Sequence, residues 1–348
     1  MIRNNGKKIR VLLVDDSALA LAVMKRIISS APDIEAAGEF RSAKEALKTL
    51  PSIDPDVICT DLHMPEMDGL EFTRQVMERF PKPILVVSVS VERSSENAFR
   101  LLEAGAVDVF SKPRGEMESG FRAHSDELLS KIRILSGVHV FKRFSRPRGP
   151  QSMPAPASRP GLRRPEIVAI GASTGGPQAL FLILSVLPRD FPVPVICVQH
   201  ISDGFLNGLI EWLGGGCAIK VCKAVEGERP VAGRVYFPEE GYHLVIDKGG
   251  AFAYSREPAN PHRPSITVTF NSLADHYGAG VIGVLLTGMG SDGAEGMRSI
   301  ASAGGATIAQ DEATSVVFSM PKKAIELGGA SEVLPLYEIS HSILSRVS

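Results

Sequence analysis

The stretch of sequence that decides the fold lies at residues 167–177 and reads IVAIGASTGGP. Its first four residues form an unbroken apolar run, which is typical of a buried strand in a parallel sheet. The G-x-S-x-G spacing that follows permits a tight turn that projects Ser173, and a helical pattern begins at Gln178. By itself, this strand, turn and helix fit a catalytic serine or a phosphate-binding loop equally well.

Two further polar residues follow apolar runs in the same half of the chain. His200 comes directly after residues 195–199, and Asp292 lies in a glycine-rich turn after residues 281–286. A catalytic serine needs a base, and the base needs a carboxylate that orients it, so we predict that Ser173, His200 and Asp292 form a triad. The order Ser, His, Asp differs from the order Ser, Asp, His of the α/β-hydrolases.

The first part of the chain alternates short apolar runs with helical patterns, which predicts a parallel sheet covered by helices. Polar residues again follow the expected strands, and the carboxyl ends of such strands meet at one edge. Three carboxylates there could bind Mg²⁺, and one of them could accept a phosphoryl group. These residues are Asp15, Asp16, Asp61, Ser88 and Lys112, and the expected strands are 9–14, 34–39, 57–59, 84–87 and 107–110.

The predicted fold class is α/β, with two doubly wound parallel-sheet domains. We expect the first to be a flavodoxin-like (βα)5 domain over residues 1–135. The second spans residues 166–348 and has an excursion of antiparallel β structure at residues 233–254. Residues 142–165 contain seven Lys or Arg, six Pro and no acidic residue, which predicts a linker over residues 136–165.

Composition excludes several classes of protein. The chain has 348 residues with 44% hydrophobic and 22% charged, so it can bury cores and is not a disordered protein. A net charge of −1 argues against general binding to nucleic acid. No apolar run reaches a membrane span or a signal peptide. The four cysteines have no metal-binding spacing, so we expect reduced thiols and a cytoplasmic protein.

Residues 9–130 resemble the response-regulator receiver domain through VDDS at 14–17, DLHMPEMDG at 61–69 and SKP at 111–113. The resemblance implies Asp61 as phosphoacceptor, Ser88 as switch hydroxyl and Lys112 as phosphoryl contact. It implies Mg²⁺ held by the carboxylates of Asp15, Asp16 and Asp61 and the backbone carbonyl of His63. Val89 and Val109 depart from the small residue and the aromatic residue that are usual in this family.

Residues 166–340 resemble the chemotaxis protein-glutamate methylesterases, the CheB family. The resemblance rests on IGASTGG at 170–176, QH at 199–200, GYHL at 241–244, HRPS at 262–265, LTGMGSDGA at 286–294 and AQDEATSVVFSMP at 309–321. It implies Ser173 as nucleophile, His200 as general base and acid, and Asp292 as the group that orients His200. Thr174 and Met289 match positions of the oxyanion site, and His262 matches a histidine near the substrate. Residues 201–202, Ile-Ser, replace the usual Met-Pro.

The resemblance implies hydrolysis of glutamyl methyl esters on chemoreceptors, and also deamidation of receptor glutamines, under control of a CheA-type histidine kinase. Mg²⁺ would serve the receiver, and the esterase would need no cofactor. We expect no nucleic-acid partner and no membrane embedding. Three alternatives stay open: a phosphorylation-controlled scaffold with an inactive esterase fold, an unrelated hydrolase of small esters, and a DNA-binding response regulator. The last lacks a helix-turn-helix pattern, and net −6 after the linker disfavours phosphate contacts.

Overall fold

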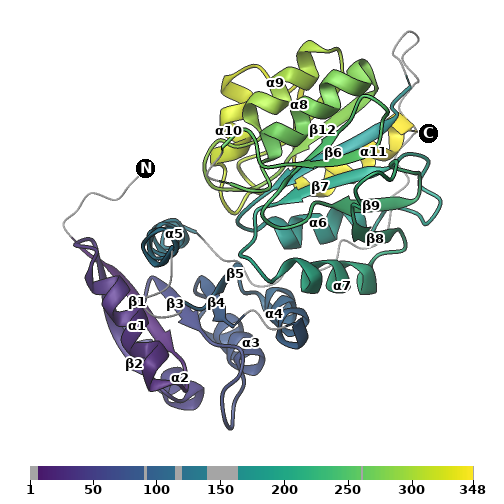
Figure 1. Cartoon of the computed structure of the whole chain (residues 1–348). Coiled ribbons are helices and arrows are strands. Elements are labelled where there is room, and N and C mark those ends of the chain that lie inside the picture. The colour runs from purple at the N-terminus through teal and green to yellow at the C-terminus, as the bar shows by residue number, and fades with distance from the viewer. Residues whose placement is uncertain (1–6, 90–91, 114–119, 139–163, 260–261, 348) are drawn as a thin grey trace. The chain divides into compact units, whose positions relative to one another are not determined.

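The computed structural model of the chain describes residues 7–89, 92–113, 120–138, 164–259 and 262–347 (Figure 1). The chain divides into two compact units, one made mostly of residues before Gly149 and the other mostly of residues from Gly149 onward. Most of the linker predicted at residues 136–165 lies outside the described residues. The two units are therefore considered separately.

The first unit is a five-stranded parallel sheet covered by helices, which confirms the predicted (βα)5 arrangement. In spatial order its strands are β2 (Ile34–Phe40), β1 (Ile9–Val14), β3 (Val57–Thr60), β4 (Ile84–Ser88) and β5 (Asp108–Ser111). α1 contacts α5, while α3 contacts both α2 and α4, so the helices form two separate groups. The helices are α1 (Ala18–Ser29), α2 (Ala43–Ile53), α3 (Gly69–Arg79), α4 (Glu92–Ala104) and α5 (Phe121–Leu135).

Strand register decides which polar residues meet at the carboxyl edge of this sheet. Val14 in β1 pairs with Thr60 in β3, so Asp15 and Asp61 leave neighbouring strands at the same level. The backbone N–H of Asp61 donates to the carbonyl of Val14 at 2.9 Å. The core beneath them is apolar and closed to solvent, because each residue of β1 from 11 to 14 is at most 1% exposed.

The second unit has a seven-stranded parallel sheet, which confirms the predicted α/β class. Its strands, in spatial order, are β14 (Glu332–Leu334), β13 (Ala306–Gln310), β12 (Val281–Leu285), β6 (Ile167–Ala172), β7 (Val195–Gln199), β9 (Arg234–Phe237) and β8 (Lys220–Lys223). In Figure 1, α8, α9 and α10 lie on one side of this sheet and α6 and α7 on the other. The helices are α6 (Gly176–Leu184), α7 (Leu206–Gly216), α8 (Ile266–Tyr277), α9 (Ala294–Ser302), α10 (Ser319–Glu326) and α11 (Leu336–Val347).

The predicted antiparallel excursion is smaller than residues 233–254. Only β10 (His243–Ile246) and β11 (Phe252–Ser255) pair antiparallel, as a separate hairpin. The residues of β9 instead pair in parallel with both β7 and β8. The physical reason is burial: Val235, Tyr236 and Phe237 are at most 1% exposed, which favours a place inside the large sheet over a two-stranded ribbon.

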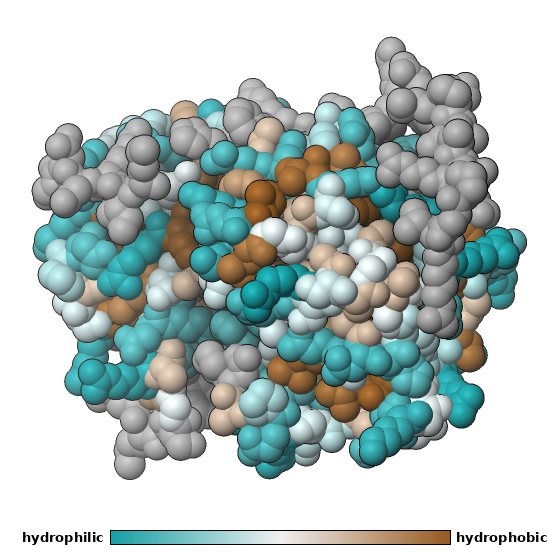
Figure 2. Space-filling model, turned by 90° about the horizontal axis from the view of Figure 1, so that it is seen from above, coloured by the Kyte–Doolittle hydropathy of each residue, from teal (hydrophilic) through white to brown (hydrophobic). Residues whose placement is uncertain are grey.

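The surface shows no extended apolar band on the face seen in Figure 2, where hydrophobic groups alternate with hydrophilic ones. Among the described residues, no helix is long and apolar enough to cross a membrane. All four cysteines are free thiols. Burial raises the pKa of Cys59 to about 12 and that of Cys217 to about 11, so neither is a ready nucleophile at neutral pH.

Candidate active site and candidate phosphoacceptor site

Ser173 lies in the turn between β6 and α6. Its backbone N–H donates to the carbonyl of Thr287 at 3.0 Å, and its carbonyl accepts from the N–H of Gly176 at 2.7 Å. Gly175 has φ 76°, in the left-handed region. A Cβ at Gly176 would lie 2.0 Å from Oε1 of Gln199. The two glycines are therefore needed for the turn that holds Ser173.

His200 is brought beside this turn by the pairing of β6 with β7. Ala172 pairs with Gln199, the last residue of β7. The backbone N–H of His200 donates to the carbonyl of Ala172 at 3.0 Å. Ser173 and His200 are thus the first residues beyond two adjacent strand ends.

Asp292 reaches the ring of His200 from the turn between β12 and α9. Nε2 of His200 lies 2.9 Å from Oδ2 of Asp292. The other ring nitrogen, Nδ1, is buried and has no hydrogen-bond partner within the described part of the chain. Nδ1 is therefore the ring atom that is available to accept a proton.

The carboxylate of Asp292 is held at the N-terminus of α8. It accepts hydrogen bonds from Oγ of Ser265 at 2.9 Å and from the backbone N–H groups of Ile266 at 2.7 Å and Thr267 at 3.0 Å. Burial alone would raise the pKa of Asp292. The hydrogen bond and charge of His200 and the hydrogen bonds from Thr267 outweigh burial and hold that pKa below its usual range. Asp292 therefore stays ionised and can stabilise a positive His200.

The three residues predicted around the triad lie in different settings. His262 stacks on His200, with ring centroids 4.4 Å apart and planes inclined by 18°. Thr174 is buried and its carbonyl accepts a hydrogen bond from Oγ1 of Thr287 at 3.0 Å. Met289 is half-buried in the turn that leads to Asp292. Oxyanion roles for Thr174 and Met289 stay predictions.

Two buried glutamines at this edge, Gln199 and Gln310, have no role predicted from the sequence. Nε2 of Gln199 donates to the carbonyls of both Ser173, at 2.8 Å, and His200, at 2.7 Å. Oε1 of Gln310 accepts from the backbone N–H of Thr287 at 2.8 Å. Each glutamine is a buried polar residue that ends an apolar strand, and that pattern could have marked both of them.

The first unit gathers three carboxylates at the carboxyl edge of its sheet. One ligand oxygen each from Asp15, Asp16 and Asp61 lies within 4.8 Å of the others. Oxygen ligands of this kind suit Mg²⁺, so the residues present fit the ion that the sequence implies. The side chain of His63 is exposed, and the prediction for it concerns only its backbone carbonyl.

Lys112 lies against two of these carboxylates. Its Nζ is 2.6 Å from Oδ2 of Asp15 and 2.8 Å from Oδ2 of Asp61. Burial lowers the pKa of Lys112, but the hydrogen bonds and charges of both aspartates raise it overall. Burial raises the pKa of Asp15 more than Lys112 lowers it. Bringing these groups together has a desolvation cost, which is typical of functional sites.

Ser88 ends β4 opposite Ser111, the residue before Lys112. Its hydroxyl is buried and has no hydrogen-bond partner among the described residues, so it is free to bind an added group. Val89 is 40% exposed and Val109 is buried. The aromatic next to Val109, Phe110, is also buried and stacks on His124 with centroids 4.4 Å apart.

The second unit carries a serine, a histidine and a buried carboxylate at strand ends, which are the features of a serine hydrolase. The first has those of a phosphoryl-accepting receiver. Comparison with known proteins identifies the family. The family described as CheB methylesterase matches residues 168–343, and the response regulator receiver domain matches residues 11–119. The chain belongs to the CheB methylesterase family and carries a receiver domain.

Individual relatives support this membership over the whole length. Protein-glutamate methylesterase/protein-glutamine glutaminase 2 of Cupriavidus pinatubonensis is 41% identical, covering 98% of this chain and 96% of that protein. The protein-glutamate methylesterase/protein-glutamine glutaminase of Thiobacillus denitrificans is 41% identical, covering 97% and 96%. The solved CheB methylesterase catalytic domain of Thermotoga maritima is 38% identical and covers 52% of this chain and 97% of its own, with a TM-score of 0.50.

Proposed function

We propose that this protein hydrolyses glutamyl methyl esters on chemoreceptors and also deamidates receptor glutamines. The observation that carries the proposal is the hydrogen bond between His200 and Asp292 beside the glycine turn of Ser173. Membership of the CheB methylesterase family and the names of the relatives support the substrate class.

The reaction uses two atoms at this site, Oγ of Ser173 and Nδ1 of His200. Oγ of Ser173 attacks the ester carbonyl carbon while Nδ1 of His200 takes the hydroxyl proton. Asp292 holds the Nε2–H and stabilises the positive ring. His200 then returns the proton to the departing methoxide, and methanol leaves. Water, deprotonated by His200, attacks the acyl-enzyme and restores both the serine and a glutamate; with a glutamine substrate, ammonia leaves in place of methanol.

Further residues are assigned by their place around the triad. We assign Thr174 and Met289 to the oxyanion site, where hydrogen-bond donors stabilise the tetrahedral intermediate. His262 contributes a surface for the substrate, which its stacking on His200 supports.

We assign residues 1–135 to the receiver, 136–165 to a linker and 166–348 to the esterase. Asp61 accepts a phosphoryl group from a CheA-type histidine kinase, with Ser88 and Lys112 in contact with it. The carboxylates of Asp15, Asp16 and Asp61 and the carbonyl of His63 would hold Mg²⁺, which neutralises charge during transfer when it is bound. Lys112, already paired with two of these carboxylates, supports this assignment.

Methanol release from methylated receptors tests the proposal directly. Wild-type protein should release methanol, and Ser173→Ala should lose at least about 10³-fold of that rate because the nucleophile is gone. Small alkyl esters should be poorer substrates than the receptor. Full release by Ser173→Ala would point to a non-catalytic scaffold, and a preference for small esters would point to a different hydrolase.

A further inference from the structure

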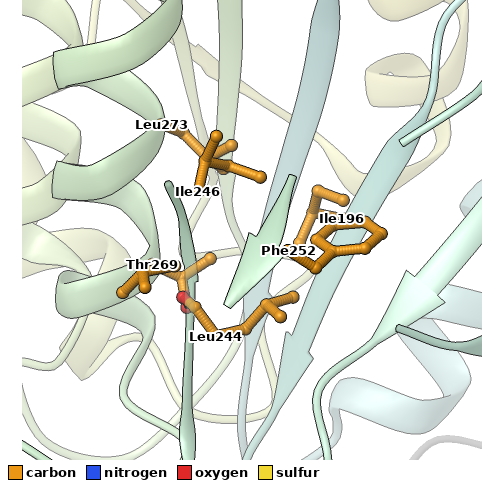
Figure 3. A pocket seen from close by; sticks show the side chains of 7 residues that line it. Ile196, Leu244, Ile246, Phe252, Thr269 and Leu273 are labelled. Atoms are coloured by element: carbon orange, nitrogen blue, oxygen red, sulfur yellow. The ribbon is translucent and has the colours of Figure 1, made fainter. Parts of the chain in front are cut away.

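The hairpin of β10 and β11 is joined to α8 along one face of that helix. Oγ1 of Thr269 donates to the carbonyl of Leu244 at 2.9 Å, and the backbone N–H of Ile246 donates to Oγ of Ser272 at 2.7 Å. Figure 3 shows Leu244 and Ile246 of the hairpin beside the α8 side chains Thr269 and Leu273. The cavity between them, which Ile196 of β7 also lines, has no room for a water molecule, so the hairpin packs closely against the helix.

His243 makes the first contact of this hairpin with α8. Its ring is fully buried. Nδ1 lies 3.1 Å from the backbone N of Ser265, and Nε2 lies 3.1 Å from the carbonyl oxygen of Pro258. A backbone N–H can only donate and a carbonyl can only accept, so Nδ1 carries no proton and Nε2 carries one. His243 is therefore a neutral ring with both nitrogens in use.

Ser265 connects this ring to the triad. It is the N-cap residue of α8, and its Oγ donates to Oδ1 of Asp292 at 2.9 Å. The next two backbone N–H groups, of Ile266 and Thr267, donate to the same carboxylate. The residue that His243 binds is thus the one from which the anchoring of Asp292 begins.

We propose that His243 is a positioning residue for the esterase reaction. It fixes the first turn of α8, that turn fixes Asp292, and Asp292 orients His200. His243 touches no reacting atom and acts only through these groups. The inference rests on the proposed esterase function for its kinetic readout.

The test compares two variants in the full-length protein whose side chains have the same number of heavy atoms and the same branching. His243→Asn keeps an oxygen that can accept from the Ser265 N–H, whereas His243→Leu has no acceptor. We expect kcat for methanol release from methylated receptors to be about 10- to 100-fold lower in His243→Leu than in His243→Asn, with KM unchanged. The loss falls on kcat because a misplaced Asp292 affects the reaction and not receptor binding. The control is His341→Leu, because His341 is an exposed residue on α11, and this variant should keep the wild-type kcat.

Equal kcat in the two folded variants, or a change confined to KM, would overturn the proposal. Proton NMR adds a second readout, the deshielded signal of the hydrogen between His200 and Asp292. If His243→Leu does not fold, the test uses His243→Asn. The NMR signal should persist in that variant, and its loss from folded His243→Asn would also overturn the proposal. Absence of methanol release by wild type would instead contradict the proposed function and leave the NMR comparison valid.

Discussion

At the scale of the residue, two buried polar side chains of the candidate active site, Asp292 and Gln199, make several hydrogen bonds each. Asp292 alone accepts hydrogen bonds from a helix N-terminus, a serine hydroxyl and a histidine. Gln199 ties the carbonyl of the nucleophile to that of the base through one amide nitrogen. Such groups are costly to leave unpaired, so each of them fixes the geometry around it.

Gln199→Glu should therefore lower kcat, although the glutamate side chain has nearly the same shape as the glutamine it replaces. A carboxylate oxygen would replace the amide N–H₂ and face two carbonyl oxygens without a proton between them. We expect a loss of about 10- to 100-fold in kcat, because Ser173 and His200 would move apart. Methanol release and a thermal unfolding curve measure the effect.

Gln75→Glu is the matched control, because Gln75 is on α3 and its amide nitrogen donates to the exposed Glu71. It should keep wild-type kcat. A Gln199→Glu protein that folds and keeps wild-type kcat would show that the amide bonds do not position the site.

At the scale of the element, strand ends and helix ends bring the functional groups together. The pairing of β1 with β3 aligns two aspartates, and the pairing of β6 with β7 aligns the serine and the histidine. Helices are fixed in turn by contacts that span the sequence. Arg133 on α5 binds Asp33, the residue before β2, through two hydrogen bonds of 2.7 and 2.9 Å.

This Asp33–Arg133 pair predicts a pH-dependent part of receiver stability. The hydrogen bonds and charge of Arg133 hold the pKa of Asp33 below its ordinary value. The stabilisation is therefore present above pH about 4 and is lost as pH falls below it. Because the pair is partly exposed, Asp33→Asn should cost about 0.2–1 kcal/mol of the free energy of unfolding at pH 7.

Urea unfolding of the receiver transition at pH 7 and pH 3 measures this difference. Wild type and Asp33→Asn should differ at pH 7 and converge at pH 3. A difference of the same size at both pH values would contradict the assignment to an ionised Asp33.

At the scale of the whole molecule, the net charge of −1 conceals an uneven distribution. The sequence carries −2 before residue 142, +7 over residues 142–165 and −6 after them. In the sequence, one sheet with its own set of polar strand ends precedes the basic stretch and the other follows it. This arrangement suits a switch joined to an enzyme.

Phosphorylation should raise the esterase rate of the full chain. We expect a small phosphodonor with Mg²⁺ to increase methanol release, and we expect Asp61→Asn or a chelator to abolish the increase, because the phosphoacceptor or the ion is then missing. Release is measured with methylated receptors as substrate.

Removing residues 1–140 tests the same regulation from the other side. If the receiver restrains the esterase, the remaining segment should release methanol faster than the unphosphorylated full chain. A slower segment would contradict restraint, provided that its circular dichroism spectrum shows a folded domain.

Much of the fold could be predicted from the sequence because its signals are local. Apolar runs marked β6, β7 and β12, and the turn glycines placed Ser173 and Asp292 at strand ends. The role of His243 could not be found in this way. Its partners, Pro258 and Ser265, are 15 and 22 residues away, and nothing in the local sequence says that they meet.

The sequence by itself determined the class of fold, the family and the candidate residue types, because hydrophobic periodicity and glycine spacing act over a few residues. Only the tertiary structure decided that β9 joins the large sheet, that Gln199 links two loops and that α8 anchors Asp292. Those features depend on which buried polar atoms pair across the fold. That pairing is set by burial and register between distant segments, and it exists only once the sheet is assembled.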